Sequence, residues 1–77
     1  MLSISDLKAG ERAMVLEMPI DVEVKRTLLV HGIHVGGKIQ ILQKFAGQGL
    51  ALIAYNGRKI ALRKPACQLI KVVKIES

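Results

Sequence analysis

His31 and His34, three residues apart, are the residue pair best suited to binding a metal ion. Imidazole is the commonest metal ligand, and on a helix this spacing would aim both rings at one ion. Gly32 lies between them, however, and glycine commonly ends a helix. No third ligand is near, since Cys67 is distant and Asp21 stands at a helix start. We expect His31 to pack at a helix end and His34 to lie in a turn, with a surface Fe²⁺ or Zn²⁺ ion as the alternative.

The pair Gly36-Gly37 precedes Lys38, as glycines do in some phosphate-binding loops. Such a loop reads G-x-x-x-x-G-K-[ST] and leads into a helix, whose N–H groups and dipole hold the anion. Here Ile39 follows the lysine and begins an alternating strand pattern. The glycine pair is therefore interpreted as a turn.

Cys67 is the single cysteine. A catalytic cysteine needs a base, and no histidine is close in sequence, while thiolate metal sites normally use several sulfurs. The serines and the threonine also lack a local histidine, and the carboxylates form no convincing metal set. We expect a protein that is not an enzyme and requires no cofactor, with Cys67 as a packing residue. A lone cysteine excludes an internal disulfide and fits a reducing compartment.

Turn residues recur about every ten positions, which is typical of a small all-β domain. One helical turn, capped by Ser3 or Ser5 and ended by Gly10, is expected first. Asn56-Gly57 is the strongest hairpin signal, because both residues accept positive φ. Residues 64–67 are expected to form another turn. The predicted strands cover residues 12–18, 38–44, 50–55, 58–63 and 69–75.

These five strands predict a mainly β fold, a small barrel whose closure removes exposed sheet edges. A short helix over residues 21–31 is inserted between the first and second strands, with Asp21 as its cap and Gly32 at its end. Val24 and Leu28 lie four residues apart and are expected to share a face.

The formal net charge of +6 favours nucleic acid, an anionic membrane or an acidic protein patch as partner. Phe45 and Tyr55 are the only aromatic residues, so a platform for base stacking is nearly missing and nucleic acid is the less favoured partner. No apolar run approaches the roughly 20 residues that cross a bilayer, and no secretion signal is recognisable. We expect a cytoplasmic protein without direct membrane insertion.

Three segments, in order, resemble the FeoA family of small bacterial proteins. The start resembles L-x-x-L-x-x-G-x-x-A-x-I, the centre resembles R-x-L-x-x-(L/M)-G-(I/L)-x-P-G, and the end resembles G-x-x-(I/L)-A-L-R-x-x-x-A-x-x-I-x-V. The matching residues are Leu7, Gly10, Ala13 and Val15, then Arg26 through Gly36, then Gly57 through Arg63 with Ala66, Ile70 and Val72. Val35 replaces the family's proline, His31 replaces an apolar residue, and Gly47-Gln48-Gly49 replaces G-D-P. The resemblance covers nearly the whole chain and implies one FeoA-like domain over residues 1–77.

The resemblance further implies an SH3-like barrel and an accessory, regulatory role in ferrous iron uptake. The implied partner is the cytoplasmic nucleotide-binding domain of the FeoB-type transporter, which would recruit the protein to the inner face of the membrane. The same barrel occurs in metal-dependent repressors, but this chain lacks a DNA-reading helix-turn-helix. The alternatives are a small basic nucleic-acid-binding barrel and a direct transition-metal-binding module. The sequence sets no oligomeric state.

Two surfaces are candidates for partner contact. One is the helix face of Lys25 and Arg26, where Leu29 either joins the surface or completes the core. The other is the glycine-rich loop between Phe45 and Leu50, where Phe45 either anchors a partner or plugs the open end of the barrel. The residues expected to bind the partner are Lys25, Arg26, Phe45, Leu50, Arg58 and Arg63.

Overall fold

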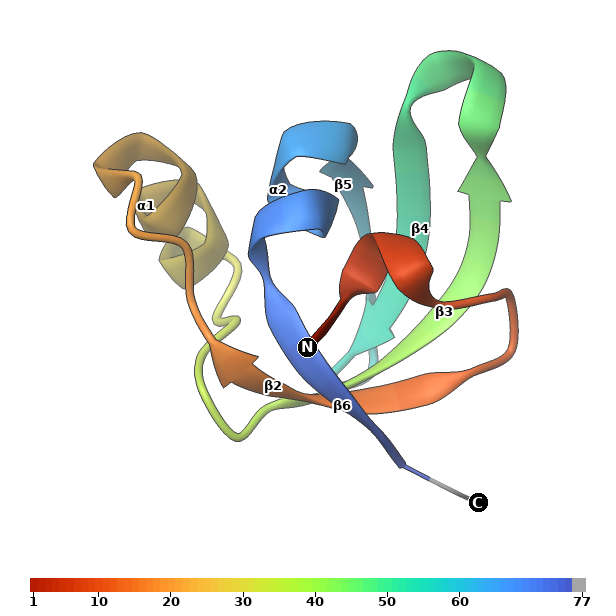
Figure 1. Cartoon of the computed structure of the whole chain (residues 1–77), viewed down its shortest axis with the longest axis horizontal. Coiled ribbons are helices and arrows are strands. Elements are labelled where there is room, and N and C mark those ends of the chain that lie inside the picture. The colour runs from red at the N-terminus through yellow and green to blue at the C-terminus, as the bar shows by residue number, and fades with distance from the viewer. Residues whose placement is uncertain (76–77) are drawn as a thin grey trace.

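The computed structural model describes residues 1–75, which form a curved six-stranded antiparallel sheet with two short α-helices (Figure 1). Glu76 and Ser77, the end of the predicted domain, lie outside the described residues. The elements are β1 Leu2–Ser3, η1 Ile4–Asp6, β2 Arg12–Glu17, α1 Val22–Val30, β3 Lys38–Phe45, η2 Ala46–Gln48, β4 Leu50–Tyr55, β5 Arg58–Arg63, α2 Lys64–Leu69 and β6 Lys71–Ile75. The strand order is β1-β6-β2-β3-β4-β5. The prediction of a mainly β fold is confirmed.

The hairpin of β4 and β5 has the predicted bounds, and Asn56 and Gly57 take φ of +50° and +76°. The prediction of a turn over residues 64–67 is wrong, because α2 occupies this segment. Pro65 lies in the first turn of α2, where a missing N–H breaks no helical hydrogen bond. β6 consequently begins at Lys71 rather than at residue 69. The two-residue β1 is a sixth strand that the sequence did not indicate.

The ends of α1 follow local sequence signals. The Asp21 carboxylate accepts a hydrogen bond from the Val24 N–H at 3.0 Å, which caps the first turn. At the other end, the Ile33 N–H donates to the Leu28 carbonyl at 2.9 Å, and Gly32 adopts φ of +81°. This is a Schellman arrangement, which satisfies carbonyls that the last turn leaves free.

The first helical turn differs from its prediction. Ser3 caps it, but η1 ends at Asp6, with Leu7 as its C-cap, rather than at Gly10. Gly10 instead takes φ of +89° in the turn before β2, and its N–H donates to the Ile41 carbonyl at 2.7 Å.

The core fills the concave side of the sheet. Its buried members include Ala13 and Val15 of β2, as well as the alternating residues of β3 and β5. β1 and β5 are the two edges of the sheet, and α2 contacts both of them. Among residues 1–75, no helix is long and apolar enough to cross a membrane. The residues of the hydrophobic cluster are Ile4, Leu7, Ala13, Val15, Leu28, Ile33, Ile39, Ile41, Ala51, Ile53, Tyr55, Ile60, Leu62, Cys67, Ile70 and Val72.

Candidate partner-binding surfaces

A β-bulge in β3 decides which side chains face outward near the loop at residues 46–49. Ile41 pairs with Ile53, but Gln43 pairs with Leu52, so Leu42 is the extra residue. A bulge reverses the in–out alternation beyond it. Lys44 therefore lies opposite buried Ala51 on the concave side.

Phe45 consequently lies on the outer face of the sheet, opposite Leu50, and Leu50 is in turn opposite Arg63. Directly paired residues project from the same face of a sheet. These three residues, which we call the outer row, come from β3, β4 and β5. Phe45 is 37% exposed on this outer face and therefore does not plug the barrel.

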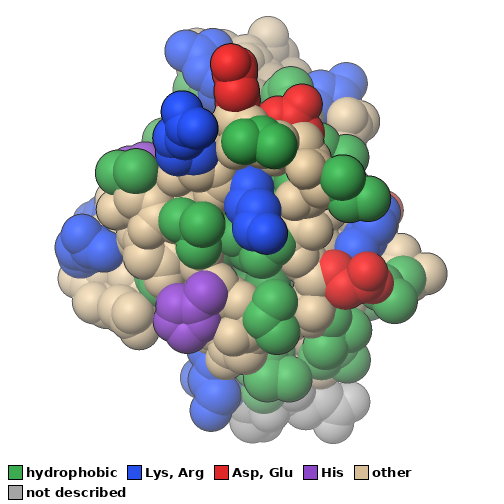
Figure 2. All heavy atoms as spheres, turned by 90° about the vertical axis from the view of Figure 1, so that its left-hand side faces the viewer, with side chains coloured by type: hydrophobic (Ala, Val, Ile, Leu, Met, Phe, Trp, Pro, Cys, Tyr) green, Lys and Arg blue, Asp and Glu red, His purple; other side chains and the backbone are tan. Residues whose placement is uncertain are grey.

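A second surface is the outward face of α1. Val22, Lys25, Arg26, Leu29 and Val30 line one shallow depression, and their spacing places them on a single helix face, which we call the α1 stripe. Figure 2 looks onto this side of the molecule and shows hydrophobic and basic side chains intermingled over it, with acidic side chains toward its edges.

Leu29 settles one question left open by the sequence. Its side chain is 51% exposed and belongs to the surface, whereas Leu28 is buried on the opposite face of α1. Val24, also on that inner face, packs partly buried against the core. The sequence prediction that Val24 and Leu28 share a core face is confirmed.

A groove of about 290 Å³ separates α1 from β5 and α2. Val24, Leu28 and Ala66 contribute apolar walls, while His31 and Arg63 line it with polar groups. Arg63 therefore belongs both to this groove and to the outer row. The end of α1 and the corner between β5 and α2 therefore lie close together, although they are far apart in the sequence.

Arg58 has a structural contact. Its Nη2 donates to the His31 carbonyl at 2.9 Å and so ties β5 to the end of α1. The His34 ring lies elsewhere, edge-on to Tyr55 with 6.4 Å between ring centroids, and its Nδ1 is 3.0 Å from the Val35 carbonyl. Within residues 1–75, no group of three His, Cys, Asp or Glu side chains could hold a metal ion. Metal binding by His31 and His34 stays the untested alternative to their expected structural role.

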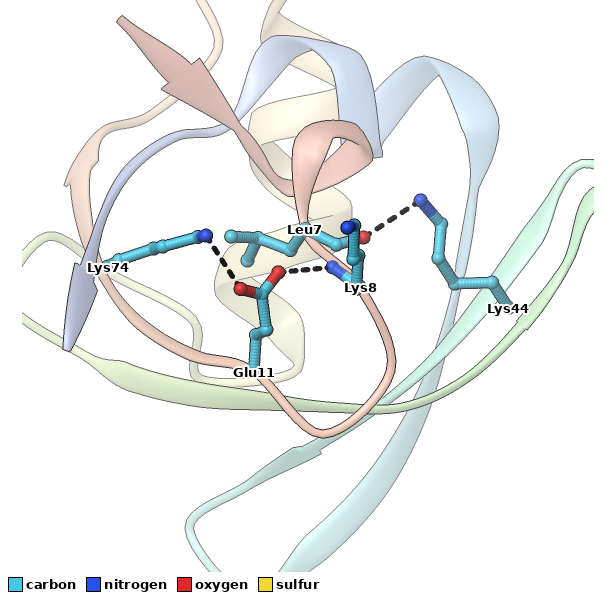
Figure 3. A network of polar contacts seen from close by, with 5 residues as sticks. All are labelled: Leu7, Lys8, Glu11, Lys44 and Lys74. Carbon is cyan, nitrogen blue, oxygen red and sulfur yellow. Dashed lines mark hydrogen bonds and ion pairs between the residues drawn. The ribbon is translucent and has the colours of Figure 1, made fainter. Parts of the chain in front are cut away.

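The groups with shifted pKa values lie outside the α1 stripe. Hydrogen bonding to Lys74, and then to the Lys8 N–H, lowers the pKa of Glu11 (Figure 3). Burial raises the pKa of the Cys67 thiol, which donates weakly to the Leu62 carbonyl at 3.8 Å. A raised pKa keeps the thiol protonated and less reactive.

The sequence analysis missed two features of these surfaces. Val22 and Val30 extend the α1 stripe, and their spacing to Leu29 could have indicated it, since residues at i, i+7 and i+8 share a face. Lys44 was not among the residues predicted to bind a partner. Nothing in the alternation of residues 38–44 signals the bulge that turns its side chain inward.

The sequence and the fold of this chain are similar to those of known proteins. A family model described as the FeoA domain matches residues 2–74. No curated protein matches the chain.

Several solved structures have the same fold. An iron uptake regulatory protein, FeoA, shares 22% identity over 96% of both chains, with a TM-score of 0.83. FeoA from Chlorobium tepidum shares 27% identity over 97% of this chain and 71% of that one, with a TM-score of 0.88.

A manganese-dependent transcriptional repressor has a TM-score of 0.91 at 21% identity, but this chain spans 41% of its length. At such identities the likeness shows the fold alone. The SH3-like fold predicted from the sequence is confirmed by these neighbours. The match over residues 2–74 establishes more: this chain belongs to the FeoA family, which is linked to ferrous iron transport.

Proposed function

We propose that this chain is a non-enzymatic accessory protein of ferrous iron uptake that contacts the cytoplasmic nucleotide-binding domain of the FeoB-type transporter. Membership in the FeoA family supports the link to iron transport. The observation that supports a binding role is the exposed, apolar and basic α1 stripe.

The apolar residues of the α1 stripe are largely exposed to solvent. Val30 is 78% exposed, Val22 is 66% exposed and Leu29 is 51% exposed. Ile20, just before the helix, is 97% exposed. Isolated exposed apolar residues are common on proteins, but a cluster rimmed by charges is typical of an interaction site.

Lys25 and Arg26 lie within the stripe and give it local positive charge, in keeping with the +6 charge of the chain. A matching surface on the transporter domain would be apolar with an acidic rim, because complementary charge speeds association and fixes register. A nucleic-acid partner is less well supported. Tyr55, one of two aromatic residues, is 2% exposed and cannot offer its ring face for base stacking.

The proposal is tested by titrating the isolated nucleotide-binding domain of an FeoB-type transporter into the labelled protein. We expect saturable binding that weakens as salt is added. Leu29→Ser should weaken binding roughly fivefold or more, since truncating a central apolar anchor costs over about 1 kcal/mol. Arg26→Glu should mainly slow association.

Two control variants show which surface binds the transporter domain. Lys38→Glu makes the same kind of charge change at an exposed residue of β3 outside the α1 stripe, and it should leave the affinity within about twofold of wild type. Phe45→Ser removes the aromatic residue of the outer row. Loss of binding in Phe45→Ser but not in Leu29→Ser would reject the α1 stripe and assign the outer row. Absence of saturable binding by the wild-type protein would refute the proposed function itself.

A further inference from the structure

A pocket of about 210 Å³ lies between η1, β4 and α2, and it shares no lining residue with the α1 stripe. Its apolar lining comes from Ile4, Ala46, Leu50, Ala51 and Cys67. Two lysines, Lys44 and Lys64, also line it, and no carboxylate does. The pocket thus combines an apolar interior with two positive charges from separate elements.

Lys44 is held in place before any ligand arrives. The β3 bulge turns it to the concave side opposite Ala51, and its Nζ donates to the Ser5 carbonyl at 2.9 Å. It also donates to the Leu7 carbonyl at 2.9 Å (Figure 3). An ammonium group has three N–H donors, so one is left for a further acceptor. Because the side chain is already ordered, an acceptor that reaches it loses less conformational entropy.

Asp6 does not neutralise Lys44 directly. Its carboxylate accepts from the Ser3 N–H at 2.8 Å and from the Ser3 hydroxyl at 3.2 Å. These hydrogen bonds, more than the charges of Lys71 and Lys44, lower the pKa of Asp6. The positive charge of Lys44 is also felt inside the pocket, where it partly offsets the burial that raises the pKa of Cys67.

Lys64 stands at the first position of α2 on the far side of the pocket. Its backbone N–H donates to the Gly49 carbonyl at 2.7 Å, which fixes the base of the side chain. Within residues 1–75, its ammonium group makes no hydrogen bond or ion pair, in contrast to Lys74, which pairs with Glu11. Of the two lysines of this pocket, Lys64 therefore has the ammonium group with more donors left for a ligand.

We propose that this pocket binds a carboxylate attached to an apolar group about the size of a leucine side chain. The apolar group fills the space beside Ile4, Ala51 and Cys67, and the carboxylate accepts hydrogen bonds from Lys44 and Lys64. Hydrogen bonds between charged groups are shorter and stronger than neutral ones, particularly beside an apolar wall. Two sources share this chemistry: the C-terminal residue of a polypeptide and a free branched aliphatic acid.

The test is an NMR titration of the ¹⁵N-labelled full chain with N-acetyl-leucine and, in parallel, with N-acetyl-leucinamide. We expect saturable shifts centred on the Leu50, Ala51 and Cys67 amides, with a Kd on the order of a few millimolar for so small a ligand. N-acetyl-leucinamide has the same apolar group without the carboxylate. It should bind roughly tenfold more weakly, because it loses the charge-assisted hydrogen bonds.

Two variants localise the charge requirement. Lys64→Gln removes the unpaired ammonium and should weaken N-acetyl-leucine binding roughly tenfold. Lys59→Gln makes the same change at an exposed residue of β5 outside the pocket, and it should leave the affinity unchanged. Lys44→Gln would also remove two hydrogen bonds to η1 and the loop after it, so its effect would combine a lost charge with an altered structure. Lys64→Gln is therefore the deciding variant.

Equal affinity for the acid and the amide would overturn the proposal, as would undiminished binding by Lys64→Gln or the absence of saturable shifts at this pocket. A third ligand, 4-methylpentanoate, distinguishes the sources. Tighter binding of N-acetyl-leucine than of 4-methylpentanoate supports a polypeptide C-terminus, because only the former has the preceding amide. Equal or tighter binding of 4-methylpentanoate supports a free acid.

Discussion

Gly37→Ala is the substitution whose effect can be worked out most directly from the structure. A Cβ atom at Gly37 would lie 2.6 Å from Cε1 and 2.9 Å from Cζ of Tyr55. Carbon atoms in contact normally stand about 3.5–4.0 Å apart, so the ring or the turn would have to move by about 1 Å. Tyr55 is 2% exposed and its ring packs edge-on to His34, so the ring has little room to retreat. The close approach of Tyr55 is what requires glycine here.

Overpacking a well-filled core costs about 1–3 kcal/mol, and the short distances at Gly37 place this variant near the upper end. In a domain of this size, each kcal/mol lowers the Tm by roughly 4–8 °C. We therefore expect Gly37→Ala to lower the Tm by roughly 10–20 °C. Thermal unfolding followed by circular dichroism, with urea unfolding as a second measurement, gives both quantities.

Gly47→Ala is the matched control, because no atom lies within 4 Å of its added Cβ and its φ is outside the left-handed region. It should leave stability unchanged or raise it by about 0.4–1 kcal/mol. A double-mutant cycle with Tyr55→Leu adds a check on mechanism: the losses should be less than additive, because the smaller side chain relieves the clash. A Gly37→Ala protein within about 0.5 kcal/mol of wild type, or strict additivity in the cycle, would refute this reasoning.

Three further predictions concern other parts of the chain. The hydrogen bond to Lys74 lowers the pKa of Glu11 in the folded protein. The ionised carboxylate therefore stabilises the fold above the ordinary pKa of 4.5, and this stabilisation is lost as the pH falls through the lower pKa of the folded state. Glu11→Gln should flatten the decline of Tm as the pH falls below 4.5. Asn56→Ala should destabilise the β4–β5 hairpin by about 1–2 kcal/mol in urea unfolding, because alanine disfavours a φ of +50°, and Asn56→Gly should restore stability. Calorimetry with Zn²⁺ or Fe²⁺ should give the same heats for wild type and for His31→Ala/His34→Ala, and heat lost only in the variant would assign a metal site to these histidines.

The features that the sequence predicted well depend on residues close to one another along the chain. Asn56-Gly57 selects its hairpin turn, Asp21 caps α1 and Gly32 ends it, each through contacts within about five positions. Such signals are nearly independent of the rest of the fold. They placed α1, β4 and β5 within a residue or two of their observed bounds.

The features that were missed depend on partners far along the chain. The β3 bulge is defined only by pairing with β4, so the sequence could not indicate that Lys44, and not Phe45, turns toward the core side. The outer row also depends on strand pairing, because Arg63 joins Phe45 and Leu50 only through the register of β4 with β3 and β5. Pro65 was interpreted as part of a turn, although proline is also common in the first turn of a helix such as α2.

In α1, the side chains that stabilise the fold differ from those proposed to bind a partner. A nine-residue helix is marginal on its own in water, so α1 depends on the packing of its inner residues Val24 and Leu28. Val22, Leu29 and Val30 project to the other side and add little to that packing. Replacing them should therefore change stability by less than about 0.5 kcal/mol, as is usual for surface positions. Because their apolar exposure does not serve the fold, loss of partner binding in Leu29→Ser at unchanged stability would assign these side chains to an interface.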